Sequence, residues 1–137
     1  MKKKNKILVV AILVFATAMS YAAANKIVPY WNYVTSVGGS IDISSGGTAS
    51  VSADGSAATI GVDNVKLYAS LQQLKNGSWV TLKTWSTEAD ARSTRITTKT
   101  WPVAHGYSYR LQISLEAYKN VTLLETGQHT EDYGYFK

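Results

Sequence analysis

The sequence predicts an all-β fold, an antiparallel β-sandwich of seven strands that follows a cleaved signal helix. Two observations support this prediction. Apolar and polar residues alternate with a period of two over long stretches, and turns rich in glycine or asparagine interrupt the alternation at even intervals. The 137 residues contain no internal repeat and no linker. We therefore expect one domain, covering residues 25–137.

The alternation is clearest in segments 65–72 and 109–117, where apolar residues take every second position. A strand with this pattern buries one face and leaves the other in water. Turn residues such as Asn76-Gly77 and Lys119-Asn120 separate the apolar patterns from one another. The expected strands are 30–43, 47–53, 64–74, 79–86, 92–101, 107–118 and 121–128.

Residues 1–24 have the three parts of a secretory signal peptide. Four lysines precede the apolar run from Ile7 to Met19, and small residues follow it up to Ala24. The apolar run has 13 residues, so a helix of it would be about 20 Å long, too short to cross a bilayer. We expect cleavage after Ala24, secretion into the extracellular space, and no stable membrane anchor after cleavage.

The charge of the mature chain excludes one class of partner. Four of the fourteen Lys and Arg residues lie in the signal peptide, so ten remain against nine Asp and Glu, a net charge of +1. This balance gives no reason to expect a nucleic-acid partner. The absence of cysteine excludes disulfides, thiolate zinc sites and cysteine nucleophiles.

Asn76-Gly77 predicts a two-residue type I′ turn that joins segments 64–74 and 79–86 in a hairpin. A regular hairpin with this turn fixes the register, and a slip of one residue would turn every side chain over. The expected pairs are Lys75–Ser78, Leu74–Trp79, Gln72–Thr81, Leu71–Leu82, Ser70–Lys83 and Tyr68–Trp85.

This register places aromatic and polar side chains together on the outer face of the hairpin. Leu67, Ala69 and Leu71 would share the core face with Val80, Leu82 and Thr84. Segment 107–118 is expected beside 64–74 and would extend the outer face. The predicted ligand-binding residues are Tyr68, Gln72, Trp79, Lys83, Trp85, Arg110, Gln112, Glu116 and Tyr118.

Aromatic rings among Gln, Lys, Arg and Glu can recognise a sugar, because a ring face covers C–H groups while the polar groups bond hydroxyls. The same residue types dominate protein–protein hot spots. A purely structural alternative is that the rings only form stabilising cross-strand pairs. A second aromatic group, Tyr30, Trp31 and Tyr33 with Tyr133, Tyr135 and Phe136, predicts that the two termini pack together and close an edge of the sandwich, or alternatively that an exposed strand adds to the sheet edge of another chain.

The sequence carries no recognisable catalytic constellation. Glu88, Asp90 and Glu116 do not form a recognisable glycosidase pair. His129 with Glu131 and Asp132, or Asp54 with Asp63 and Asn64, offer at most weak metal sites. We therefore expect no metal, no cofactor and no enzymatic activity.

Two resemblances follow from particular motifs. Gly106-Tyr107-Ser108-Tyr109, followed by Leu111 and Ile113, resembles the start of strand F in fibronectin type III and related immunoglobulin-like domains. Tyr109 would then be the corner tyrosine, whose hydroxyl bonds to upstream backbone. The fold that this resemblance implies is an immunoglobulin/fibronectin-like sandwich.

The second resemblance covers nearly the whole chain. It is carried by the lysine-rich signal and by Pro29-Tyr30-Trp31-Asn32-Tyr33, Ile41 to Gly47, Gly77-Ser78-Trp79, Lys83-Thr84-Trp85-Ser86 and Gly106 to Arg110. These motifs resemble a group of small exported proteins from Gram-positive bacteria that carry a domain of unknown function. The resemblance implies export and fold, and it implies no activity.

Together these features predict a secreted, non-enzymatic binding module whose partner is a surface glycan or a protein. The alternative is a bacteriocin-like antagonistic protein. The net charge of +1 and the lack of a strongly amphipathic segment disfavour a membrane-active killer. The sequence does not determine the oligomeric state.

Overall fold

The computed structural model describes residues 31–137, so the predicted signal peptide lies outside the described residues. Within the described part, no helix is long and apolar enough to cross a membrane. Seven strands make up this part: β1 (Val34–Ile43), β2 (Thr48–Ala57), β3 (Asn64–Lys75), β4 (Ser78–Ala89), β5 (Ser93–Pro102), β6 (Tyr107–Lys119) and β7 (Thr122–Phe136).

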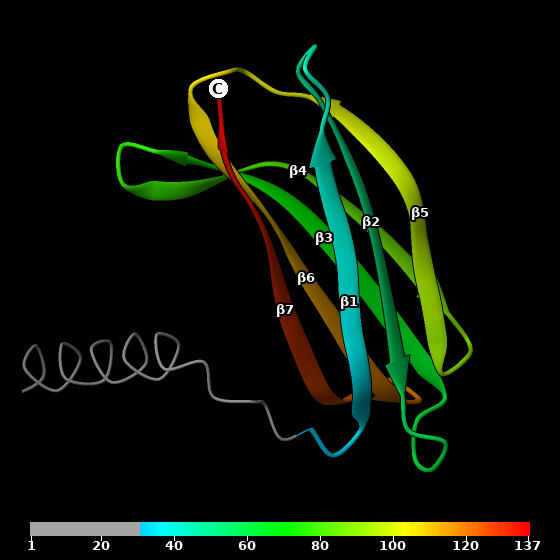
Figure 1. Ribbon diagram of the computed structural model, residues 1–137. Helices are drawn as coiled ribbons and strands as arrows, with labels where there is room; N and C mark the ends of the chain where they lie inside the picture. Colours follow the sequence, from blue (N-terminus) through cyan, green and yellow to red (C-terminus); the bar gives the residue numbers. More distant parts are fainter. Residues whose placement is uncertain (1–30) are drawn as a thin grey trace, which may run out of the picture. The chain divides into compact units, whose positions relative to one another are not determined.

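The strands form two antiparallel sheets that face each other (Figure 1). One sheet has the order β1-β2-β5 and the other has the order β4-β3-β6-β7. This arrangement confirms the predicted seven-stranded immunoglobulin/fibronectin-like β-sandwich. The tip of the β3–β4 hairpin extends beyond the body of the sandwich (Figure 1).

The core lies between the sheets and is built by the alternation in β3 and β6. Every second residue of these central strands is buried, from Val65 to Leu71 and from Tyr109 to Ala117. The facing strand β2 contributes small residues, so the two sheets approach closely. At Gly39 a Cβ atom would collide with the side chain of Ile113 and with the backbone of Ser52, which explains why a strand interior carries glycine there.

Tyr109 forms the predicted corner. Its side chain is completely buried, and its hydroxyl donates a hydrogen bond of 2.6 Å to the backbone oxygen of Ala104. The side-chain amide of Gln73 donates to the same hydroxyl at 2.9 Å. The phenol therefore fixes the loop before β6 to the sheet that β6 enters.

The largest difference from the predicted strand limits is at the C-terminus, where β7 ends at Phe136 rather than near residue 128. The second half of β7 contains charged residues and glycine, which are uncommon in strands, so the sequence did not predict a strand there. It is a strand because β6 offers hydrogen-bonding partners along its full length, down to the pair Tyr107–Phe136.

Each of the four edge strands contains a register shift that adds a residue to the edge strand. The shifts lie in β1 beside Val34, in β5 opposite Ser52, in β4 at Leu82, and at two places in β7. A bulge of this kind twists an edge and disrupts its row of free hydrogen-bonding groups. All four edges are therefore poor templates for pairing with another chain.

The bulge in β4 overturns half of the predicted hairpin register. The pairs next to the turn are confirmed, from Lys75–Ser78 to Gln72–Thr81. Beyond them Leu82 is an extra residue, so Leu71 pairs with Lys83, Ser70 with Thr84 and Ala69 with Trp85. The predicted pairs Leu71–Leu82, Ser70–Lys83 and Tyr68–Trp85 were wrong. Thr84, predicted in the core, instead lies on the outer face, where its hydroxyl is 2.8 Å from that of Ser70.

Bulges also position the two charged side chains that join the sheets at their open sides. Lys83 pairs with the buried Leu71, and its ammonium lies 5.3 Å from the ring centre of Trp101 on β5. On the other side Glu125 follows the extra residue Leu124 and pairs with the buried Ala117. Its carboxylate accepts hydrogen bonds from three successive backbone N–H groups at the start of the described chain, those of Asn32, Tyr33 and Val34.

Glu125 should contribute a pH-dependent part of the stability. Partial burial disfavours its charged form, but the three backbone donors outweigh burial and lower its pKa from the usual 4.5. Because the folded-state pKa lies below the unfolded one, this contribution is complete above about pH 4.5 and is lost as the pH falls through the folded-state pKa.

We expect Glu125→Gln to lower the free energy of unfolding at pH 7 by about 1–2 kcal/mol. The side-chain NH2 of glutamine is a donor, and in this partly solvated site it would face backbone N–H groups, which are donors too. Urea denaturation at a series of pH values measures this. Glu88→Gln removes the same charge from a side chain that is 61% exposed, and it should change little. An equal loss in both variants, or a Glu125→Gln deficit that persists unchanged into acid, would contradict the role of the carboxylate.

Tyr30 lies outside the described residues, and the prediction that the other terminal aromatic residues pack together was wrong. Trp31 and Tyr33 pack against the core cluster that contains Val34, near the start of β7. Tyr133 and Phe136 belong to a different cluster, around Tyr109, and Phe136 stacks on His105 with ring centres 4.2 Å apart. The two groups are separated because β1 begins at the end of the sandwich where β7 begins, and β7 ends at the other.

Candidate functional site

The outer face of the four-stranded sheet carries seven of the nine residues predicted to bind a ligand. Pairing across β4, β3, β6 and β7 puts them on the side opposite the buried alternate residues, and each is partly exposed. These residues are Tyr68, Gln72, Trp79, Arg110, Gln112, Glu116 and Tyr118.

Lys83 and Trp85 do not belong to this face. Trp85 is partly buried and packs against both core clusters, and Lys83 turns toward β5 in the other sheet. Their predicted place on the outer surface was wrong because the extra residue Leu82 turns the following side chains over. The proposed recognition surface thus loses one indole and keeps the other.

At the hairpin end of the face, Trp79 and Arg110 are stacked. The guanidinium carbon of Arg110 lies 4.2 Å from the ring centre of Trp79. Arg110 donates from Nε to the side-chain oxygen of Gln72 at 2.8 Å, and the amide of Gln72 donates to the hydroxyl of Thr81 at 3.2 Å. These contacts hold the indole of Trp79 against the sheet, and the guanidinium of Arg110 covers one face of the indole ring.

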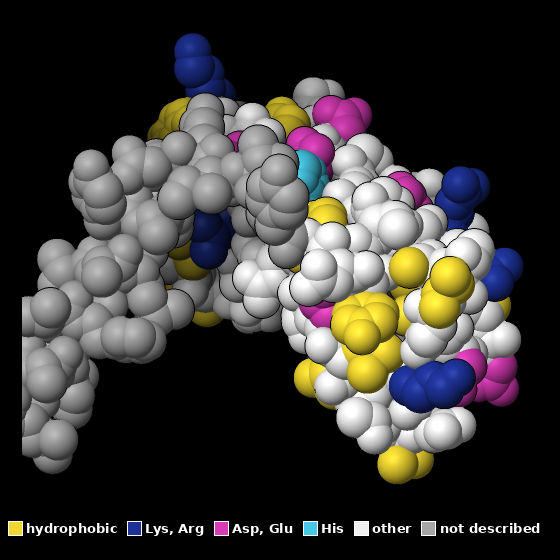
Figure 2. Space-filling model, turned by 90° about the horizontal axis from the view of Figure 1, so that it is seen from below, with side chains coloured by type: hydrophobic (Ala, Val, Ile, Leu, Met, Phe, Trp, Pro, Cys, Tyr) yellow, Lys and Arg dark blue, Asp and Glu magenta, His cyan; other side chains and the backbone are white. Residues whose placement is uncertain are grey.

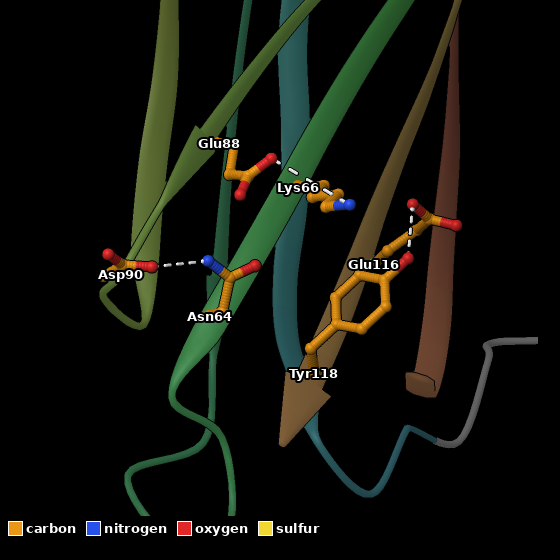
Figure 3. A network of polar contacts seen from close by, with 6 residues as sticks. All are labelled: Asn64, Lys66, Glu88, Asp90, Glu116 and Tyr118. Atoms are coloured by element: carbon orange, nitrogen blue, oxygen red, sulfur yellow. Dashed lines mark hydrogen bonds and ion pairs between the residues drawn. The ribbon is translucent and has the colours of Figure 1, made fainter. Parts of the chain in front are cut away.

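At the opposite end of the face, a second polar network surrounds Lys66 (Figure 3). Lys66 pairs in register with Glu88 on one side and with Glu116 on the other. Its ammonium is 3.9 Å from Glu88 and 5.0 Å from the ring centre of Tyr118. The Tyr118 hydroxyl donates to Glu116 at 3.1 Å.

This second network borders a shallow hollow of ≈ 550 Å³. Asn64 on its wall donates to Asp90 at 2.8 Å, and Asp63 accepts the backbone N–H of Asn120 at 2.9 Å and 3.1 Å. The lining residues come from the start of β3, the ends of β4 and β6, and the adjoining loops: Asp63, Asn64, Lys66, Glu88, Asp90, Tyr118, Asn120 and Val121.

Apolar side chains are exposed at this end of the sandwich. Val121, which lines the hollow, is 95% exposed, and Ile60 in the β2–β3 loop is 83% exposed. Seen from below, the described atoms at this end of the sandwich include apolar patches next to basic and acidic groups (Figure 2). The end of the molecule thus offers apolar contact and hydrogen-bonding groups within a small area.

Tyr118 in the network and Tyr68 on the adjoining part of the outer face both remain protonated. Burial, and then the neighbouring carboxylate of Glu116, raises the pKa of Tyr68 and that of Tyr118 above the usual 10.0. Both phenols therefore keep their protons at neutral pH. The carboxylate of Glu88 makes a smaller contribution to both shifts.

Most of the residues around the hollow were not predicted as site residues. Lys66 and Glu88 stand at outward positions of alternating strands, and Asn64 and Asn120 flank turns, where polar residues are ordinary. The available signal was topological. Antiparallel neighbours bring the start of β3, the end of β4 and the end of β6 to one place, so polar residues at these three points had to meet.

The weak metal sites considered from the sequence do not assemble. Among residues 31–137 no three His, Asp or Glu side chains gather in an arrangement that could hold an ion. His129 instead pairs with Glu131 at 2.8 Å. Asp54 pairs with Gly38 and Arg95 in the three-stranded sheet, apart from Asp63 and Asn64.

No protein-family model matches the chain, and no curated protein is significantly similar to it.

Proposed function

We propose that the protein is a secreted, non-enzymatic module that binds a surface glycan through the outer face of its four-stranded sheet. The observation that supports this best is the hollow beside Tyr118. It combines one aromatic ring, an exposed apolar side chain and a ring of amide, carboxylate and ammonium groups. Secretion rests on the signal-peptide pattern of residues 1–24.

The chemistry of the hollow suits a polyhydroxylated ligand. Sugar hydroxyls both donate and accept, so a sugar site needs both kinds of partner close to an apolar surface. Lys66 and the amides of Asn64 and Asn120 donate, while Asp63, Glu88 and Asp90 accept. Hydrogen bonds within the wall hold Asn64, Asp63 and Tyr118 in place before a ligand arrives, which limits the entropy lost on binding.

A screen of the purified protein on arrays of cell-surface polysaccharides tests the proposal, followed by titration calorimetry. We expect a polysaccharide to bind, and we expect Tyr118→Ala to weaken binding by about three- to tenfold, the usual worth of an aromatic contact. Arg95→Ala provides a matched control, since Arg95 is exposed on the three-stranded sheet and pairs with Asp54.

Three results would contradict the proposal. The first is that no saccharide on the array binds. The second is that Arg95→Ala weakens binding as much as Tyr118→Ala does. The third is the recovery of a protein partner by pull-down whose binding Tyr118→Ala abolishes, which would assign the same face to protein recognition. Growth inhibition by purified protein in the absence of saccharide binding would favour the antagonistic alternative.

A further inference from the structure

A second, smaller hollow adjoins the first on the outer face. Its volume is ≈ 280 Å³, and Tyr68, Ser86 and Thr87 line it together with Lys66 and Glu88. The last two residues also line the first hollow. The Lys66–Glu88 ion pair is thus the shared wall between two neighbouring depressions, one on each side of it.

The two hollows follow each other along β3. Asn64 lines the first and Tyr68 lines the second, four residues further on. Four residues of a strand span about 13 Å, which is longer than a single pyranose ring. Each hollow contains one tyrosine, Tyr118 in the first and Tyr68 in the second. A ligand can therefore contact a tyrosine in each of the two hollows, at a fixed spacing.

We propose that the two hollows are consecutive subsites for a linear, uncharged oligosaccharide, with the Lys66–Glu88 pair at their junction. This inference rests on the proposed glycan-binding function and specifies its ligand as a chain rather than a single sugar. One unit lies beside Tyr118 and a later unit of the same chain lies beside Tyr68. Lys66 and Glu88 bond the hydroxyls between them.

The charges of the lining exclude an acidic chain. Lys66 is the single cation among the lining residues of both hollows, against the three carboxylates of Asp63, Glu88 and Asp90. Asp63 and Asp90 bond neutral donors, a backbone N–H and an amide, so their charges are not compensated there. A uronate or phosphate chain would be repelled by this excess of negative charge.

Titration of the full-length secreted protein with neutral oligosaccharides from monomer to hexamer tests the inference. The probes are cello-oligosaccharides and N-acetylglucosamine oligomers, with any neutral polymer found on the array hydrolysed to the same lengths. We expect the affinity to rise at least tenfold between the monomer and the length that fills both subsites, and then to level off. An oligouronate of equal length should bind at least tenfold more weakly.

Two tyrosine variants separate the subsites. Tyr68→Ala should lower the affinity for long oligomers about three- to tenfold and leave that of the shortest bound oligomer unchanged, whereas Tyr118→Ala should weaken both. Affinity that does not depend on length, or equal loss for all lengths in Tyr68→Ala, would overturn the two-subsite inference and leave glycan binding intact. Failure of every saccharide to bind would overturn the proposed function itself, and with it this inference.

Discussion

Replacing Tyr109 by alanine is expected to destabilise the protein by about 3–5 kcal/mol, the range for removing a large buried aromatic side chain. Tyr109 is completely buried and belongs to the cluster of Ile43, Ala49, Leu71 and Phe136. The variant also loses the hydroxyl that ties the loop at Ala104 to β6. A domain of this size has a total stability of about 5–15 kcal/mol, so the loss could leave the chain largely unfolded at 37 °C. Urea denaturation followed by circular dichroism measures it.

Tyr109→Phe separates packing from hydrogen bonding at the same position. It keeps the ring and removes the bonds to Ala104 and Gln73, so we expect a loss of about 1–2 kcal/mol. Amide exchange in the loop before β6 should accelerate in this variant, because the hydroxyl is one of the contacts that hold the loop. If Tyr109→Phe is as damaging as Tyr109→Ala, or if neither variant changes stability, then the corner does not have the role assigned here.

The second large effect is expected for Trp85→Ala, at about 2–4 kcal/mol. Trp85 is partly buried and contacts both core clusters, so its removal leaves a cavity that only partly collapses. Trp79→Ala is the matched control, since the indole of Trp79 lies on the outer face and mainly stacks on Arg110. It should cost less than about 1 kcal/mol.

The comparison of these two variants tests the register of the hairpin directly. In a hairpin without the bulge at Leu82, Trp85 would lie on the outer face with Trp79, and both substitutions would be mild. A similar small loss in both variants, with unchanged cooperativity of unfolding, would therefore contradict the inward position of Trp85. The fluorescence of Trp85 should also be less accessible to a soluble quencher than that of Trp79.

The sequence alone was sufficient for the fold. In β3 and β6 both the buried and the exposed positions follow a strict period of two, and one face of each strand is covered by the other sheet. The turn at Asn76-Gly77 was also predictable, because Asn76 and Gly77 both have positive φ, as a type I′ turn requires. The position of β6 beside β3 was also predicted, and the two strands pair from Asn64–Tyr118 to Leu74–Ser108.

Only the tertiary structure decided which side chains reach the outer face beyond Leu82. A bulge inserts one residue without changing composition, and the segment from Thr81 to Ser86 alternates plausibly in either register. Contacts with the core resolve it, because Leu82 and Trp85 are three residues apart and can both pack inward only if the bulge is present. The hollow likewise could not be predicted from the sequence. Its walls come from Asp63, Glu88 and Asn120, which are far apart along the chain and meet only because neighbouring strands run in opposite directions.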